Sequence, residues 1–396
     1  MSPRLGPSRR SAVPPFTVMT VLEAVAAARA EGREVISLCA GEPGQGAPST
    51  VREAGARLLA ESVPLGYSET RGIRPLRAEL AGHYRRWYGL DLDPDDFCVT
   101  TGSSGAFLLA FLAAFDPGDR VAVARPGYPE YVNILRALGC EVVELDTGAE
   151  ARFQPTVDLL AAAHARGPLH GLVVASPANP TGTMIRDAEL AAILDWCAGQ
   201  GVRVVSDEIY HGVTYTGSVG TCARQHQPDA IVVSSFSKFW GMTGWRLGWM
   251  VMPGDIAPRI DALAGNLALC APVPAQHAAV AAFTPQAYAE GERAVAGFAQ
   301  ARAMVLDAAP GLGWTGVAPA DGAFYVYAGI GDVLGPHPDS VAWCRALLDQ
   351  HDVALTPGVD FDAAHGDRYV RLSLAAGPAA VQAALPRIAA FTAGLG

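Results

Sequence analysis

Lysine is almost missing from this 396-residue chain. Of its 29 lysine and arginine residues, Lys238 is the sole lysine. Because the chain is also rich in alanine, glycine and proline, codon bias explains the missing lysines, but it does not explain the one that remains. Arginine replaces lysine on solvated surfaces and in most salt bridges, whereas its guanidinium keeps its charge and cannot attack a carbonyl carbon. Lys238 is therefore a candidate nucleophile.

Excess positive charge, paired cysteines and long apolar runs are also lacking. The formal net charge of -10 argues against a nucleic-acid partner, since binding to phosphates needs a cationic surface. No segment reaches the roughly 18 uninterrupted apolar residues of a membrane span, and an N-terminus broken by Pro14 and Pro15 is not typical of a signal peptide. The seven cysteines follow no C-x-x-C pattern, which argues against disulfides and a metal site. We expect a cytoplasmic protein with small-molecule partners.

The length exceeds what one hydrophobic core usually organises, so we expect two domains. Between about residues 95 and 253, short β-branched apolar runs alternate with segments of helical periodicity. This alternation is typical of βαβ units, and it predicts an α/β fold whose mostly parallel sheet binds ligands at the carboxyl ends of its strands. Strands are expected at 121–124, 142–145, 172–175, 202–205, 231–234 and 247–252, and helices at 129–138, 157–165 and 188–198.

The segments on either side predict a second, smaller α+β domain. Ser49 and Thr50 are expected to cap a helix that runs to about Glu61, and a long helix is expected at 287–308, before strands at 322–327 and 369–374. We assign residues 1–45 to an N-terminal arm and part of the small domain. Residues 46–290 form the large domain in this assignment, and residues 291–396 form the C-terminal small domain.

Six short motifs follow predicted strands, where a doubly wound sheet places its site. They are TGSSGA (101–106), RPGYPEY (125–131), SPANPTG (176–182), SDEIY (206–210), SSFSKFWGMTGWRLG (234–248) and YVRLS (369–373). Their joint occurrence and order resemble the class I and II aminotransferases, which are fold type I enzymes dependent on pyridoxal 5'-phosphate (PLP). The resemblance covers nearly the whole chain after residue 15. It implies a seven-stranded, mostly parallel sheet flanked by helices in the large domain.

The resemblance also assigns residues to the cofactor. It implies that Lys238 holds PLP as a Schiff base and that Asp207 pairs with the pyridine nitrogen, which keeps the ring a strong electron acceptor. Asn179 and Tyr210 match residues that hydrogen-bond the phenolic oxygen, and Tyr128 matches the aromatic residue that stacks on the ring. Lys238, Asp207 and Tyr210 are the catalytic residues in this interpretation.

The cofactor phosphate needs hydrogen-bond donors and positive charge. Gly102, Ser103 and Ser104 precede a helix predicted at 106–115, whose N-terminus is suited to an anion, and Ser235 and Arg246 match further phosphate ligands of the family. Tyr67 matches the tyrosine that reaches the phosphate from the neighbouring subunit. The resemblance therefore implies a homodimer with shared active sites.

The substrate is expected to bind through its α-carboxylate. Arg371 matches the arginine that clamps this group with two parallel donors, and Gly41 and Asn179 match residues that border it. The expected activity is transfer of an amino group between an L-amino acid and a 2-oxo acid.

A neutral or aromatic amino acid is the expected donor. One dicarboxylate-specific branch of the family is expected to place a lysine in the phosphate-loop turn, where this chain has Ser104. Trp240 and Trp245 lie close to Lys238 in the sequence, and they either line an apolar substrate pocket or belong to the core.

Two alternative functions use the same fold. The first is a PLP-dependent lyase, cyclase or synthase, because PLP generates the same carbanion and the shape of the pocket decides its fate. The second is a non-catalytic regulatory module. The short tail before Pro15 leaves no room for a helix-turn-helix, and the intact set of Lys238, Asp207 and Arg371 argues for activity.

Overall fold

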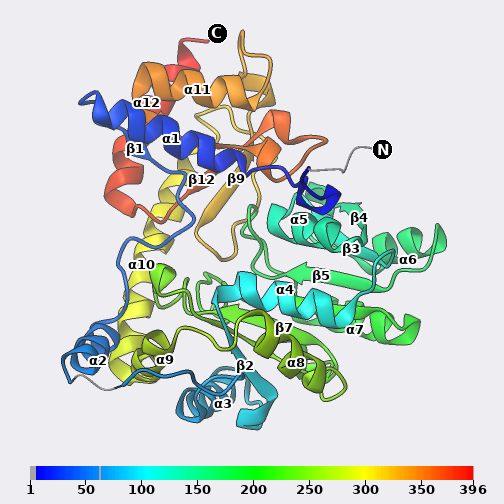
Figure 1. Ribbon diagram of the computed structural model, residues 1–396. Coiled ribbons are helices and arrows are strands. Elements are labelled where there is room, and N and C mark those ends of the chain that lie inside the picture. The colour runs from blue at the N-terminus through cyan, green and yellow to red at the C-terminus, as the bar shows by residue number, and fades with distance from the viewer. Residues whose placement is uncertain (1–5, 62–63, 396) are drawn as a thin grey trace.

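The computed structural model describes residues 6–61 and 64–395 and has a seven-stranded sheet at its centre (Figure 1). Strand β8 runs antiparallel to its neighbours β2 and β7, whereas all other neighbouring strands are parallel. The order across the sheet is β2 (Phe97–Thr100), β8 (Gly248–Val251), β7 (Ile231–Ser235), β6 (Arg203–Asp207), β5 (Gly171–Ala175), β3 (Arg120–Arg125) and β4 (Glu141–Asp146). The predicted mostly parallel sheet is confirmed, and each strand expected between residues 121 and 252 lies within two residues of its observed bounds.

Helices cover both faces of this sheet because successive side chains of a strand point to opposite faces. In β5, Val173 packs into the core beneath one set of helices, while Leu172 and Val174 pack into the core beneath the other. The first set is α4 (Gly102–Ala114), α5 (Pro129–Leu138) and α8 (Ala257–Leu267), and the second includes α6 (Val157–Ala165) and α7 (Asp187–Gln200). The apolar β-branched runs of the sequence are therefore buried on both sides.

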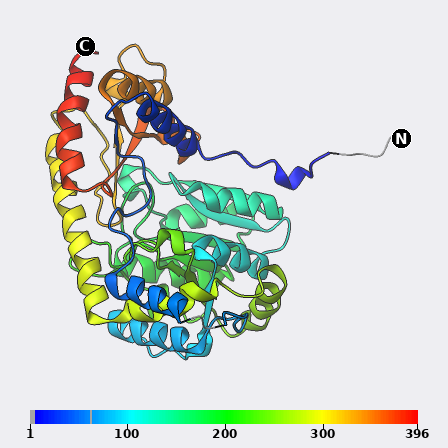
Figure 2. The same cartoon turned by 60° about the vertical axis from the view of Figure 1, so that its left-hand side comes forward.

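Four further helices extend this part of the molecule. They are α2 (Ser49–Ala60), α3 (Arg74–Tyr88), α9 (Val273–Ala279) and α10 (Pro285–Ala308). Helix α10, yellow in Figures 1 and 2, packs against α2 near its start and against the C-terminal helix α12 (Pro378–Ala393). The predicted domain boundary at residue 290 falls inside α10, and the three domain ranges stay a prediction.

The C-terminal elements include a three-stranded antiparallel sheet. Its strand order is β11 (Thr356–Pro357), β12 (Tyr369–Ser373) and β9 (Tyr325–Gly329). The N-terminal segment joins these elements: β1 (Ile36–Ser37) pairs with β10 (Val353–Ala354), and α1 (Thr17–Ala30) lies beside β11 (Figure 1). Helix α11 (Ser340–His351) precedes β10. Residues 17–37 thus lie with the C-terminal elements, an arrangement that places α1 near the site described below.

The predicted capping role of Ser49 and Thr50 is wrong. Helix α2 begins at Ser49 after Pro48, which supplies no side-chain cap, and the backbone N–H of Ser49 donates to the Glu290 carboxylate at 2.9 Å. The Ser49 hydroxyl instead donates to Glu290 of α10, and the Thr50 hydroxyl donates to the carbonyl of Ala281 at 2.9 Å. Partners brought close by the tertiary fold therefore replaced the local bonds that the sequence favoured. No helix among the described residues is both long and apolar enough to cross a membrane.

Candidate active site

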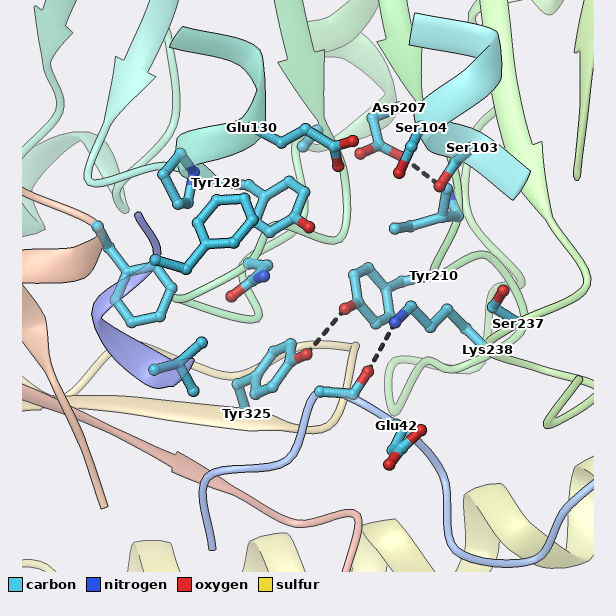
Figure 3. A pocket seen from close by; sticks show the side chains of 18 of the residues that line it. Glu42, Ser103, Ser104, Tyr128, Glu130, Asp207, Tyr210, Ser237, Lys238 and Tyr325 are labelled. Atoms are coloured by element: carbon cyan, nitrogen blue, oxygen red, sulfur yellow. Dashed lines mark hydrogen bonds between the residues drawn. The ribbon is translucent and has the colours of Figure 1, made fainter. Parts of the chain in front are cut away.

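A cavity of about 540 Å³ opens at the carboxyl ends of β5 and β6, between the large sheet and the C-terminal elements. It gathers residues that lie up to 355 positions apart in the sequence, from Phe16 to Arg371, many of them drawn in Figure 3. The predicted site residues that line it are Gly41, Ser103, Ser104, Tyr128, Asn179, Asp207, Tyr210, Lys238, Arg246 and Arg371.

Lys238 projects into this cavity from the loop after β7. Its Nζ donates to the carbonyl of Gly41 at 2.7 Å and lies 5.6 Å from the centre of the Tyr210 ring (Figure 3). Burial, followed by the positive charge of Arg371, lowers the pKa of Lys238 from 10.5 to about 8. A substantial fraction of this amine is therefore neutral near physiological pH and can attack a carbonyl carbon.

Asp207 is the last residue of β6, and 3% of it is exposed. One carboxylate oxygen accepts the backbone N–H of Ile209 at 3.0 Å, and the other accepts the hydroxyl of Tyr131. Burial raises the pKa of Asp207 from 3.8 to about 7, although these two hydrogen bonds partly oppose the shift. A protonated ring nitrogen beside this carboxylate would restore its ionised form.

Arg371 lies in the middle of β12 and is 4% exposed. Its Nη1 donates to the side-chain oxygen of Asn179 at 2.9 Å, and its Nη2 donates to the carbonyl of Cys39 at 2.8 Å. The guanidinium stacks on the rings of Tyr325 and Phe361, 4.3 and 4.6 Å from their centres. Its Nε has no hydrogen-bond partner among the described residues. The guanidinium is thus held in one plane, as two-pronged carboxylate binding requires.

The N-terminus of α4 approaches Arg246 closely because glycine occupies its first position. Gly102 has a φ of +69°, and a Cβ atom there would lie 2.5 Å from Nη2 of Arg246. Gly248 on β8 makes a similar approach, since a Cβ atom there would lie 2.8 Å from the backbone nitrogen of Ser103. The free N–H groups of the helix, the hydroxyls of Ser103 and Ser104, and a guanidinium therefore surround one place suited to an anion (Figure 3).

These groups fit PLP. The cavity supplies an amine of lowered pKa for the aldehyde, a buried carboxylate for the ring nitrogen and a glycine-built cradle for the phosphate. Tyr128 borders the same space with its ring. Among the described residues, no group of three or more histidine, cysteine, aspartate or glutamate side chains is placed to hold a metal ion.

Two of the predicted site residues lie outside the cavity wall. The hydroxyl oxygen of Ser235 lies 3.2 Å from the carbonyl oxygen of Leu247 and 2.9 Å from the hydroxyl of Ser237, and it is Ser237 that lines the cavity. Tyr67 is 82% exposed and does not border the cavity of its own chain. The roles of Ser235 and Tyr67 toward the cofactor stay predictions.

The sequence-based interpretation missed two tyrosines. Tyr131 donates to Asp207, and Tyr325 lies 3.0 Å, oxygen to oxygen, from Tyr210 (Figure 3). Tyr131 belongs to the RPGYPEY motif, which was already assigned to the site, so the sequence could have predicted that Tyr131 lies there. Tyr325 lies in β9, where periodicity predicts a strand but not the element that the strand faces.

The suggestion that Trp240 and Trp245 form an apolar substrate pocket is wrong. Trp240 is 3% exposed, its indole N–H donates to the carbonyl of Ala282 at 2.8 Å, and Trp245 packs partly buried against the same core. Neither lines the cavity. Proximity to Lys238 in the sequence was misleading because the loop after Lys238 turns back into the core. The apolar wall comes instead from the N-terminal segment, at Phe16, Val18, Met19 and Leu22.

Comparisons with known proteins agree with this geometry. Residues 33–388 match the family of aminotransferases of class I and II. The chain is 50% identical over 383 residues to the valine–pyruvate aminotransferase of Mycobacterium tuberculosis, covering 96% of this chain and 97% of that protein. It is 34% identical over 387 residues to the aspartate/prephenate aminotransferase of Thermus thermophilus, covering 97% and 98%.

Solved structures show the same fold. A crystal structure of an aminotransferase from Mycobacterium tuberculosis superposes with a TM-score of 0.95 at 49% identity, covering 99% of this chain and 100% of that one. The aspartate aminotransferase of Thermus thermophilus with maleate gives a TM-score of 0.91 at 31% identity, covering 98% and 100%. The fold predicted for a type I PLP enzyme is confirmed. From its cavity, its sequence and its fold, the chain belongs to the class I and II aminotransferases and is a PLP-dependent enzyme.

Proposed function

We propose that this aminotransferase moves the amino group of a neutral, apolar L-amino acid to a 2-oxo acid. The observation that carries the proposal is the charge of the cavity wall. Among the described residues that line it, the cationic ones are Lys238, Arg246 and Arg371. With Arg246 on the cofactor phosphate and Arg371 on the substrate α-carboxylate, this wall offers no further cation for a side-chain carboxylate.

The anionic groups on the same wall argue further against an acidic donor. Glu42, Glu130 and Asp360 all line the cavity, and Glu130 lies beside Tyr128 in Figure 3. A second carboxylate on the substrate would meet like charges in a partly desolvated space. A neutral side chain avoids this repulsion.

The apolar wall supports an aliphatic side chain. Phe16, Val18, Met19 and Leu22 line one side of the cavity, and Phe361 lines it beneath Arg371. Burying an aliphatic side chain against such a surface is favourable by roughly 25 cal/mol per Å² of apolar area. The relative from Mycobacterium tuberculosis is named for valine and pyruvate, which agrees with a branched aliphatic donor.

We assign the following roles to the chain's own residues. Arg371, held flat by its two rings, orients the substrate through its α-carboxylate, and Asn179 braces Arg371. Asp207 holds a proton on the cofactor's ring nitrogen. Tyr210, which lies against Tyr325, donates toward the phenolic oxygen. When bound, PLP withdraws electrons from the substrate's α-carbon.

Lys238 both holds the cofactor and moves the proton. Its Nζ would hold the cofactor through the aldehyde, and the same Nζ, when free, would move the proton at the substrate's α-carbon. The lowered pKa of about 8 suits this base, because a group that titrates near the working pH both accepts and returns a proton readily.

A single-turnover experiment tests the proposal. PLP-loaded enzyme is mixed with valine, leucine, alanine, phenylalanine or aspartate in the absence of an oxo acid, and the cofactor is analysed by mass spectrometry. We expect conversion to pyridoxamine phosphate with the aliphatic donors and little conversion with aspartate. Unchanged PLP beside an eliminated or cyclised substrate would favour the lyase alternative, and fastest conversion with aspartate would refute the proposed donor class.

A further inference from the structure

The first half of helix α1 forms part of the cavity wall but has little core of its own. The buried residues of α1 are Val25 and Ala28, which both lie in its second half. In the first half, Val18 and Leu22 are partly buried, and Met19 is 52% exposed although it lines the cavity. Fully buried packing therefore fixes the end of α1 that lies farther from the site, whereas the nearer end packs on the same core only through partly buried side chains such as Val18 and Leu22 and depends more on other contacts.

A single carboxylate holds that nearer end. Asp360 accepts the backbone N–H of Thr17 at 2.7 Å and that of Val18 at 3.2 Å, one on each oxygen. Phe16, the residue before the helix, supplies no side-chain cap. The first N–H groups of a helix lack intrahelical partners and carry its positive dipole end, so a carboxylate at this place both satisfies and attracts them.

The segment around Asp360 also contacts the groups that orient the substrate. Asp360 ends the short helix η8 (Gly358–Asp360), and the next residue, Phe361, packs its ring beneath the Arg371 guanidinium. The carbonyl of Phe361 accepts the N–H of Gly127 at 3.0 Å, and the ring of Tyr128 stacks on Phe16 at 6.2 Å. One short segment thus contacts α1, the carboxylate clamp and the loop that carries Tyr128.

We infer that Asp360 is a positioning residue for substrate selection. By holding the first turn of α1 at a fixed distance from Arg371, it fixes the wall of Val18, Met19 and Leu22 against which a branched side chain packs. The inference rests on the proposed function, since it concerns how that site distinguishes one apolar donor from another. Alanine reaches this wall with a single methyl group, so it depends on the position of α1 far less than valine does.

The test compares the wild type with Asp360→Ala and Asp360→Asn as PLP-loaded enzymes. We expect Asp360→Ala to lower kcat/KM for valine about tenfold, mostly through KM, and to lower kcat/KM for alanine less than about threefold. Hydrogen exchange of residues 16–30, followed by mass spectrometry, should become faster in the same variant. Asp360→Asn keeps one acceptor oxygen without the charge. Its kcat/KM for valine and its exchange rate should lie between those of the wild type and those of Asp360→Ala. It also keeps the test decisive if the alanine variant does not fold.

Asp339 provides a matched control. It is also a carboxylate at a helix N-terminus, but as the N-cap residue of its own helix α11 it accepts the N–H of Ala342 at 2.8 Å, and it does not line the cavity. Asp339→Ala should lower the melting temperature. It should leave unchanged both the ratio of kcat/KM for valine to kcat/KM for alanine and the hydrogen exchange of residues 16–30.

Two outcomes would overturn the inference. One is an Asp360→Ala enzyme whose valine-to-alanine ratio equals that of the wild type, and the other is unchanged exchange in residues 16–30. If the proposed function is wrong, the wild type itself will react with neither valine nor alanine, which distinguishes that outcome from the two above. The exchange measurement needs no substrate, so it tests the hold of Asp360 on α1 in either case.

Discussion

Lys238 shows how burial prepares a basic side chain for attack on an aldehyde. With a pKa lowered to about 8, about a tenth of its amine is neutral at pH 7. We expect PLP to attach to the apoenzyme about tenfold faster at pH 8 than at pH 6.5, with little further gain above pH 9, as followed by absorbance of the attached cofactor. Because Arg371 contributes to the lowered pKa, Arg371→Leu should move the midpoint to higher pH. An attachment rate independent of pH between 6.5 and 8 would contradict this.

Asp207 makes the folding stability of the apoenzyme depend on pH. Its pKa is raised from 3.8 to about 7 in the fold, so between these values the folded chain binds more protons than the unfolded chain. Stability of the apoenzyme contributed by this group therefore falls as the pH rises through that window.

Asp207→Asn tests this dependence because asparagine does not titrate. From pH 5 to pH 8, we expect the apoenzyme of the wild type to lose on the order of 1–3 kcal/mol more stability than the variant, measured by thermal melting at each pH. Added PLP should stabilise the wild type more than the variant, since the variant lacks the charge that pairs with the ring nitrogen. Parallel losses in the two apoenzymes would show that Asp207 is ionised in both states.

Helix α4 depends on Gly102 at its first position. Gly102→Ala would place a Cβ atom 2.5 Å from the Arg246 guanidinium at a φ of +69°, which L side chains rarely adopt. We expect this variant to bind PLP at least about tenfold more weakly, as measured by titration of the apoenzyme, because the strain of about 1–3 kcal/mol falls on the phosphate cradle.

Gly105→Ala in the same helix is the control. A Cβ atom there would have its nearest neighbour at 3.6 Å, an ordinary contact, and alanine favours the helical conformation. This variant should melt at the same or a higher temperature and keep its affinity for PLP. Equal affinity in both variants would show that the approach of α4 to Arg246 does not matter for the phosphate.

Element prediction succeeded where short-range pattern decides the outcome. The helices expected at 129–138 and 157–165 have the observed bounds of α5 and α6. The local sequence pattern wrongly predicted that Ser49 caps α2, whereas its hydroxyl donates to Glu290 in a distant helix. The pattern also did not predict that α1 lines the cavity. Both misses depend on partners more than 200 residues away, and local periodicity carries no information about them.

The assembly of the whole molecule is a further prediction. Tyr67 is 82% exposed, a large exposure for an aromatic side chain, and the resemblance assigns it to the phosphate of a neighbouring subunit. We expect a homodimer, with a mass twice the 41.2 kDa of the chain by light scattering. Tyr67→Phe should weaken PLP binding several-fold without changing that mass, since only one hydroxyl is lost. A monomer that is fully active would refute the shared site.

The sequence by itself determined the family and cofactor of this protein and predicted its site residues. A sole lysine, an aspartate ending a buried strand and an arginine within a strand were readable because each role demands one residue type, and the motifs around them fixed the family. The tertiary structure alone decided what surrounds the substrate side chain. Trp240 turned into the core, while Met19 and Asp360 came to the cavity from opposite ends of the chain. Such contacts arise from closure of the fold over hundreds of residues, so the proposed substrate selection depends on packing that no local pattern records.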